Sequence, residues 1–414
     1  MKALLRTAVR ALVVTVVLTG GLVAVLVAVL AHALRPAEGE WSTRLRLGPF
    51  AFDTSVPAVW RVVSHPVVLQ AAAGRTWTSP FGPVRWQAGA AEGEWFAECA
   101  PCSVARPEWG REPVTVPRVA VTFRHGFGDT AAGRVVVGDA PRAVVGQWSL
   151  AMRRDGATLD VHFADVPIAD AYATLAAVVP EARHAVIGGR LDLHATLQLP
   201  SRALQVAPVL RGFQVSGLGT EALVHAQPAC GDVPTGGFGR WLPRAVLAAE
   251  DQRFHEHTGI DVDELAAAWS TNQARGTVVR GGSTLSQQLA KLLFTGEGRS
   301  PVRKARELLY AVELDRTLGK ARVLQLYLAM APWGEGLCGA AAAARTYLHK
   351  DVARLTPLEA AWLASLLHNP DRDRQRLQRD GRVDTARVDW VMAQMRPLPP
   401  VKQRVPAARW LPPS

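Results

Sequence analysis

The sequence predicts a multidomain protein with an N-terminal transmembrane helix, a β-rich (α+β) middle domain and a mainly α C-terminal domain. Three observations lead to this fold class. Residues 11–31 carry no charge and are mostly Val, Leu and Ala. Residues 36–230 contain stretches in which apolar and polar residues alternate, the period of a half-buried strand. From residue 240 onward, apolar residues recur at helical spacing instead.

The uncharged run is long enough to cross a bilayer as a helix, here assigned to residues 11–34. Lys2, Arg6 and Arg10 precede it, so the positive-inside rule places residues 1–10 in the cytoplasm and the remaining chain in the periplasm. A cleavable signal peptide is the alternative, but its apolar region is typically about 7–15 residues long. The expected location is the inner (cytoplasmic) membrane, with a single pass.

The net charge of +11 could suggest a nucleic-acid partner. Because nearly all of the chain is expected to be exported, we predict no nucleic-acid binding. An anionic membrane surface or a pyrophosphate-linked lipid is a better partner for this charge.

The four cysteines divide into a close pair and two distant residues. Cys99 and Cys102 form a CxxC that, outside the cytoplasm, favours a disulfide over half of a zinc site, since no second pair with ligand spacing follows. A redox-active pair is a weaker alternative, because no thioredoxin-like unit surrounds it. Cys230 and Cys338 are expected to be unpaired.

The middle domain, residues 36–230, is predicted to be β-rich, with an unknown role. Leu191, Leu193, Ala195, Leu197 and Leu199 fall on one face of a strand, and similar patterns occupy 147–152, 157–163 and 204–215. Turn-like breaks occur at 154–156 and 188–189, and a helix is predicted over 168–179, before Pro180. This domain is the expected contact for an envelope protein partner.

A glycine-rich linker over 231–239 is predicted to lead into a helical domain at 240–370. Pro243 suits the first turn of a helix that runs into Glu250, and Ser300-Pro301 is a strong helix start with Gly319 as its stop. Later helices are expected over 321–330, 339–348 and 357–367. Residues 371–414 are rich in Arg and Pro and are predicted to form a short surface helix and a loose tail.

The first chemically informative block is residues 250–261, which begins with Glu250 and Asp251. Glu250 follows the apolar stretch 245–249, so both desolvation and the neighbouring carboxylate should raise its pKa towards the range of a useful general base. The alternative is an acid at a helix end that only pairs with Arg253 or caps a turn. His257, four residues before Asp261, is expected to organise the loop rather than to bind a metal.

The second block, residues 281–291, begins with two glycines and a cap-type Ser283. Glycine allows close backbone approach, and a helix N-terminus attracts anions. Gln287, Gln288 and Lys291 lie on one helical face, and Lys291 is one of only 6 lysines in the chain. A compact ammonium group suits phosphate, although a capped amphipathic helix with solvated polar residues explains the same pattern.

The third block is Arg303-Lys304-x-x-Glu307, whose charged residues share one helix face. It could hold a diphosphate between cations, with a carboxylate among them. The alternative is a surface ion-pair cluster, which usually contributes little to stability.

Residues 240–370 resemble the peptidoglycan glycosyltransferase family, which includes the monofunctional biosynthetic transglycosylases. Five motifs occur in the family's order: the three blocks above, Lys320–Leu328, and Gly334-x-Gly336-x-x-Gly339 followed by 342–347. The first block matches Glu-Asp-x-x-Phe-x-x-His-x-Gly-x-Asp at every specified position. The fourth motif departs from the family, with Gln325 in place of Glu and Ala329 in place of Asn.

The resemblance implies an α-helical, lysozyme-like domain that faces the periplasm and polymerises lipid II into β-1,4 glycan strands, releasing undecaprenyl pyrophosphate with inversion. Glu250 would be the catalytic base, and Glu307 would be the second acidic catalytic residue, orienting the cations or a metal. Residues 262–280 would correspond to a mobile stretch near the membrane. The implied substrate-binding residues are Asp251, Phe254, His257, Gly282, Ser283, Thr284, Gln287, Gln288, Lys291, Arg303 and Lys304.

By the same resemblance, the partners are lipid II, the growing glycan strand and the membrane. No cofactor is required, no residue is assigned as a metal ligand, and a divalent cation (Mg²⁺ or Mn²⁺) could assist at the pyrophosphate. A glycan-cleaving lysozyme-like enzyme is one alternative, but it would not need the cations Lys291, Arg303 and Lys304. A non-catalytic membrane-anchored scaffold from the same family is another, suggested by Gln325, Ala329 and the large middle domain.

Overall fold

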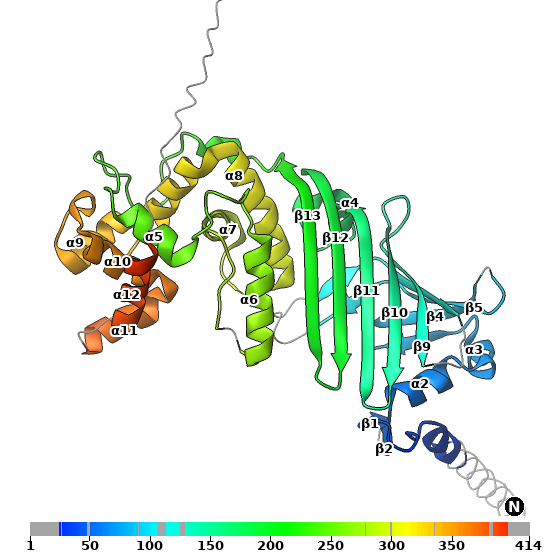
Figure 1. The fold of residues 1–414 in the computed structure, drawn as a ribbon. Coiled ribbons are helices and arrows are strands. Elements are labelled where there is room, and N and C mark those ends of the chain that lie inside the picture. Colours follow the sequence, from blue (N-terminus) through cyan, green and yellow to red (C-terminus); the bar gives the residue numbers. More distant parts are fainter. Residues whose placement is uncertain are drawn as a thin grey trace, which may run out of the picture. The chain divides into compact units, whose positions relative to one another are not determined.

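The structure is a computed structural model that describes residues 25, 27–47, 50–89, 91–105, 113–124, 129–277, 279–298, 300–334, 336–380 and 384–395 (Figure 1). The chain forms two compact units. Unit 1 comprises Met1–Gly217, Val262–Gly282 and Gly298–Ala305, and unit 2 comprises Leu218–Asp261, Ser283–Glu297 and Arg306–Ser414.

Unit 1 is built on a nine-stranded antiparallel sheet with the order β13-β12-β11-β10-β9-β8-β5-β4-β3 (Figure 1). Most neighbours are also consecutive in the chain, whereas β5 pairs with β8. The strands are β3 Thr76–Ser79, β4 Gly82–Ala88, β5 Glu94–Cys99, β8 Val119–Arg124, β9 Thr130–Val137, β10 Val144–Arg153, β11 Gly156–Pro167, β12 Val186–Leu199 and β13 Ala203–Ser216. Two small hairpins pair β1 Thr43–Leu47 with β2 Phe50–Thr54, and β6 Cys102–Val104 with β7 Val114–Val116.

The strands predicted from alternation lie within β10, β11, β12 and β13, which confirms those predictions. Leu193 pairs with Phe163 on one side and Pro208 on the other, so the apolar rows of three strands lie on one face. The predicted turn at 188–189 is wrong. Gly189, with φ of 101°, lies at a register shift inside β12, because glycine can enter this backbone region and form a bulge.

Unit 1 also contains α2 Val56–Val63, α3 Pro66–Ala72, α4 Ile168–Ala173, the 3-10 turn η2 Pro180–Arg183 and α6 Val262–Arg275. The helix predicted over 168–179 therefore ends early, at Ala173. Leu69 of α3 is buried with Trp95 and Phe123 of the sheet. Trp60 of α2 packs edge-on against Phe123 with ring centroids 5.5 Å apart, which supports a packing role for this tryptophan.

Helix α6 lies against the edge strand β13. The Trp269 indole donates a hydrogen bond to the Leu204 carbonyl over 3.2 Å, and the Leu204 amide donates to Gln273 Oε1 over 3.0 Å. An edge strand presents backbone groups without partners in the sheet. The α6 side chains therefore satisfy backbone groups at this edge.

Unit 2 is helical. Its elements are η3 Thr220–Leu223, α5 Leu242–Glu250, α7 Leu285–Ala290, the π-turn η4 Lys291–Thr295, α9 Ala340–Leu348, η5 Val352–Arg354, α10 Pro357–Ser365, η6 Leu366–His368, α11 Pro370–Asp380, α12 Thr385–Gln394 and most of α8 Pro301–Met330. The first turn of α8 belongs to unit 1. Gly319, predicted to end a helix, instead marks a kink in α8, with φ of 71° and ψ of 162°.

The core of unit 2 gathers α5, α10 and α12. Val388 and Val391 of α12 are buried in it, at 5% and 0% exposure. The sequence had indicated only a surface helix and a tail after residue 370. Val388, Val391 and Met392 do recur at helical spacing in α12, but the Arg- and Asp-rich stretch before this helix concealed so short a period.

Most of the predicted membrane helix, residues 11–24 and 26, lies outside the described residues. Within the part of the chain that the structure describes, no helix is both long and apolar enough to cross a bilayer.

Both cysteine pairs form disulfides. The predicted Cys99–Cys102 bond is confirmed. The expectation that Cys230 and Cys338 are unpaired is wrong, since they form a disulfide with Cα atoms 6.0 Å apart. Their separation of 108 residues gave no sequence signal of proximity, because only the folded chain brings them together.

We predict that Cys230→Ser with Cys338→Ser destabilises unit 2 by about 5 kcal/mol, because the disulfide restricts a long loop in the unfolded chain. Hydrogen exchange of α5, α8 and α10 peptides during urea unfolding measures this change. The control, Cys99→Ser with Cys102→Ser, opens a short loop and should destabilise unit 1 by about 2 kcal/mol. An unchanged midpoint for the long-range pair would contradict the prediction.

Candidate active site

Glu250 is the last residue of α5, a helix that carries Pro243 in its first turn as predicted. Ala245 and Val246 of this helix are fully buried, which fixes its C-terminal end against the core. Glu250 Oε2 accepts a hydrogen bond from Gln288 Nε2 over 3.2 Å, and Glu250 Oε1 lies 3.3 Å from Arg387 Nη2. The two carboxylate oxygens are therefore held from different helices, α7 and α12.

The Glu250 side chain is only 14% exposed. Burial raises the pKa of its carboxyl, and the negative charge of Asp251 acts in the same direction. Arg387 and the hydrogen bond from Gln288 oppose this shift, but the pKa remains above its ordinary value. A carboxylate of this kind binds a proton more readily than an exposed one, so it suits a general base.

Tyr327 of α8 orients the Gln288 amide. Its hydroxyl donates to Gln288 Oε1 over 2.8 Å, which leaves the amide nitrogen of Gln288 facing Glu250. Burial and the nearby charge of Glu250 raise the pKa of Tyr327 well above its usual range, so the phenol remains a donor at neutral pH.

Asp251 joins the first block to the second. Its carboxylate accepts a hydrogen bond from the Leu285 amide over 2.8 Å and contacts His257 Nε2 at 3.0 Å. Lys320 Nζ lies 3.4 Å from His257 Nδ1 and 2.8 Å from Asp315 Oδ1. His257 therefore bridges the buried carboxylate of Asp251 and the ammonium group of Lys320, which indicates a proton on Nε2.

The same loop contains Phe254 and Gly259, both of which serve packing. Phe254 is 1% exposed and lies under Lys320, whose Nζ is 4.5 Å from the ring centroid. Gly259 has φ of 94°, and a side chain there would bring Cβ within 2.5 Å of the Ala311 carbonyl oxygen. Only glycine allows this approach of the loop to α8.

Thr284 and Gln287 form a capping box at the start of α7. The Thr284 hydroxyl also donates to the Gly259 carbonyl over 2.6 Å. Both residues are buried, with exposures of 2% and 0%. The structure thus places these two predicted substrate-binding residues where they hold α7, whereas Gln288 beside them faces Glu250.

Ser283 is half-buried, and the preceding Gly282 ends a segment of unit 1. A Cβ on Gly282 would lie 2.9 Å from that of Ala268, so this glycine permits close packing on α6. Besides its predicted place in the substrate site, Gly282 therefore has a packing role within unit 1.

The predicted cations are divided between the units. Lys291, in unit 2, forms a 2.6 Å ion pair with the exposed Glu297. Arg303 and Lys304 lie in the first turn of α8, in unit 1, where Ser300 Oγ accepts from the Arg303 amide over 3.1 Å as the predicted cap. Glu307 follows on α8 in unit 2 and is 2% exposed.

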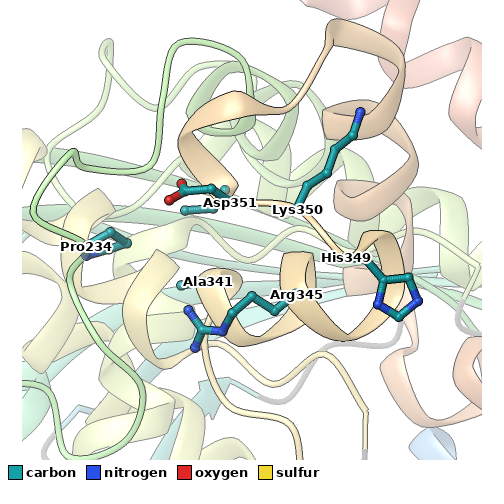
Figure 2. Close-up of a pocket in the computed structure, with 7 residues that line it drawn as sticks. Pro234, Ala341, Arg345, His349, Lys350 and Asp351 are labelled. Atoms are coloured by element: carbon teal, nitrogen blue, oxygen red, sulfur yellow. The ribbon is translucent and has the colours of Figure 1, made fainter.

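A separate cleft in unit 2, of about 320 Å³, lies at the C-terminal end of α9 (Figure 2). It is lined by Pro234, Ala341, Arg345, His349, Lys350, Asp351 and Val352. None of these is a predicted site residue. The residues that contact Glu250 are not among those that line this cleft.

Arg387 is the main residue that sequence reasoning missed. It lies 137 positions after Glu250 in a segment rich in arginine, so nothing in the sequence distinguished it. Tyr327 was recognised as part of the fourth motif, but its contact with Gln288 depends on the packing of α7 against α8.

Residues 226–396 match the family model described as Transglycosylase. This part of the chain is transglycosylase-like. The match confirms the resemblance inferred from the five motifs, and it extends to residue 396 and so includes α12.

Similar proteins have the name biosynthetic peptidoglycan transglycosylase. Those of Salmonella paratyphi B and Klebsiella oxytoca are each 44% identical over 158 residues, covering 38% of this chain and 64% of the relative. That of Chromobacterium violaceum is 46% identical over 129 residues, covering 31% of this chain and 57% of the relative. The chain thus spans less than two thirds of the length of these relatives.

We predict that Asp251→Ala destabilises unit 2 by roughly 2–5 kcal/mol, because it leaves the buried Leu285 amide and His257 without their acceptor. Urea unfolding measures the change. Glu256→Ala is the matched control, since Glu256 is in the same loop, is 61% exposed and forms a surface ion pair with Arg253. Equal stabilities of the two variants would contradict the structural role of Asp251.

Proposed function

We propose that this protein is an inverting peptidoglycan glycosyltransferase that polymerises lipid II into β-1,4 glycan strands and releases undecaprenyl pyrophosphate. The transglycosylase match over 226–396 and the names of the relatives support the reaction class. The observation that carries the proposal is Glu250, a largely buried carboxylate with a raised pKa and both oxygens held in place.

In this mechanism, Glu250 removes the proton from the 4-hydroxyl of the acceptor GlcNAc. The resulting oxygen nucleophile attacks the anomeric carbon of the donor MurNAc. The bond from that carbon to the diphosphate breaks, and its electron pair leaves with undecaprenyl pyrophosphate. The raised pKa of Glu250 favours this role, because a base is most effective when its pKa approaches the working pH.

The leaving diphosphate needs positive charge, for which we propose Lys291, Arg303 and Lys304. Lys291 is half-buried and paired with Glu297, so it would exchange this exposed carboxylate for the diphosphate. Glu307 would orient the cations of α8. Asp251, Phe254, His257, Thr284 and Gln287 would act mainly by holding the loop and α7, while Gly282, Ser283 and Gln288 would border the bound sugars.

We propose that no cofactor is required, and that a divalent cation such as Mg²⁺ or Mn²⁺ at the pyrophosphate would add positive charge. Within the described residues, no group of three or more His, Cys, Asp or Glu side chains could hold a metal ion. No step of the mechanism passes through one.

We further propose that the chain is anchored in the inner membrane by residues 11–34, with the lysozyme-like domain in the periplasm. The uncharged run supports the anchor, and two disulfides suit an oxidising compartment. Residues 36–230 would provide the contact for an envelope protein partner.

The departures in the fourth motif have structural partners that weaken the case for a non-catalytic scaffold. Gln325 Oε1 accepts a hydrogen bond from Arg322 Nη1 over 2.6 Å, and Arg322 also donates to the Leu223 carbonyl over 3.2 Å. Ala329 is fully buried, and a Cβ on Gly231 would lie 2.1 Å from its carbonyl oxygen. Both positions therefore contribute to local packing. Neither is close to Glu250 in the sequence.

We predict that Glu250→Gln lowers lipid II polymerisation by about 10²–10⁴-fold, the usual contribution of a general base. The full chain in detergent is incubated with labelled lipid II, and the products are resolved by size and by lysozyme digestion. Glu256→Gln, an exposed substitution in the same loop, should retain the wild-type rate. As much polymer from Glu250→Gln as from the wild type would contradict the role of Glu250. If the wild type instead shortened glycan strands supplied to it, the protein would be a cleaving enzyme.

A further inference from the structure

Helix α12 brings a guanidinium group to the end of α5. Arg387 Nη2 lies 3.3 Å from Glu250 Oε1 and donates to the Ala249 carbonyl over 3.4 Å. The last carbonyls of a helix have no partner within the helix, and the C-terminal end of a helix attracts cations. Arg387 thus both caps α5 and holds the carboxylate that follows this carbonyl.

The position of Arg387 is fixed by packing on both sides. Asp384 caps α12 by accepting a hydrogen bond from the Arg387 amide over 3.2 Å, and the next residue, Val388, is buried in the core. Helix α12 packs against both α5 and α10. The guanidinium also lies 5.9 Å from the Trp390 ring, and the side chain is only 24% exposed. A side chain this restricted can define the orientation of its partner.

We propose that Arg387 is a positioning residue for the polymerisation reaction, holding Glu250 Oε1 while Gln288 holds Oε2. The plane of the carboxylate is then fixed before the acceptor sugar arrives. Misplacement by about 1 Å can lower a rate about 10²-fold, so this orientation matters for proton transfer. The inference rests on the proposed function, since it assigns a role to Arg387 within that reaction.

Arg387 also affects the protonation of Glu250. The groups acting on Glu250 are Asp251 at the end of α5, Gln288 of α7 and Arg387 of α12, while Tyr327 of α8 approaches as a neutral phenol. Of these, Arg387 is the cation and favours the ionised carboxylate. Its removal raises the pKa of Glu250 further, so the base remains protonated up to a higher pH. The acidic limb of the rate profile should then move to higher pH.

The test measures kcat and KM for lipid II polymerisation from about pH 5 to about pH 9, on both sides of the neutral pH at which a general base is most useful. Arg387→Gln should lower kcat by about 10–100-fold with a smaller change in KM, and should move the acidic limb upward by about one pH unit. Arg387→Lys should restore the acidic limb but only part of kcat, because lysine keeps the charge and loses the planar fork.

Two further variants separate positioning from folding. Asp389→Asn changes a charge on the exposed side of α12 and should leave both the profile and kcat unchanged. Asp384→Ala weakens the cap of α12 but keeps the guanidinium, so a general loosening of this helix would lower kcat without moving the acidic limb. Thermal unfolding of each variant checks that unit 2 remains folded.

The outcomes are distinct. Wild-type kcat and an unmoved acidic limb in Arg387→Gln, with Glu250→Gln inactive, overturn the positioning role and leave the proposed function standing. A lower kcat in Arg387→Gln that Arg387→Lys does not restore at any pH, with the limb unmoved, also overturns it in favour of a packing role. Absence of polymer from the wild type overturns the proposed function and this inference with it.

Discussion

The hydrogen bonds that Asp251 accepts from Leu285 and His257 determine how the site is assembled. They fix the residue after Glu250 to the start of α7. Gln288, one turn into α7, consequently meets the Glu250 carboxylate. The two acidic neighbours therefore have different roles. Asp251 accepts hydrogen bonds from buried donors. Glu250 has a raised pKa, and its two carboxylate oxygens contact different helices, α7 and α12.

The sequence predicted those parts of the fold that depend on local periodicity or on local motifs. The alternation of apolar and polar residues located β10 to β13. The predicted helix starts at Ser300-Pro301 and at the proline of α5 are also confirmed. Each of these patterns is contained in a few neighbouring residues. Long-range contacts carry no such signal. The Cys230–Cys338 disulfide and the Arg387–Glu250 pair each join positions more than a hundred residues apart, and only the packing of the helices brings them together.

The roles of individual site residues were harder to predict than the position of the site. Thr284 and Gln287 look in sequence like polar groove residues, but they satisfy the first amides of α7 and each other. A polar side chain at a helix start can serve a ligand or the backbone, and the sequence pattern is the same for both. Gln288 is distinguished from them only by its contacts with Tyr327 and Glu250.

The transglycosylase match does not coincide with one compact unit. Residues 262–282 lie within the matched region, yet they group with the sheet, where α6 is bonded to β13 through Trp269 and Gln273. The chain leaves unit 2 after Asp261 and returns at Ser283. Unit 1 therefore contains a helix from the matched region as well as the β-rich sheet.

In the proposed reaction, Glu250 can act as the base because burial raises the pKa of its carboxyl. The most direct test is a titration of its side-chain carboxyl carbon by NMR in the folded wild-type chain labelled at glutamate, with the resonance assigned from its loss in Glu250→Gln. We predict a midpoint above the ordinary value for a glutamate side chain, because burial outweighs the charge of Arg387. A midpoint at or below that ordinary value would show that Glu250 is not such a base.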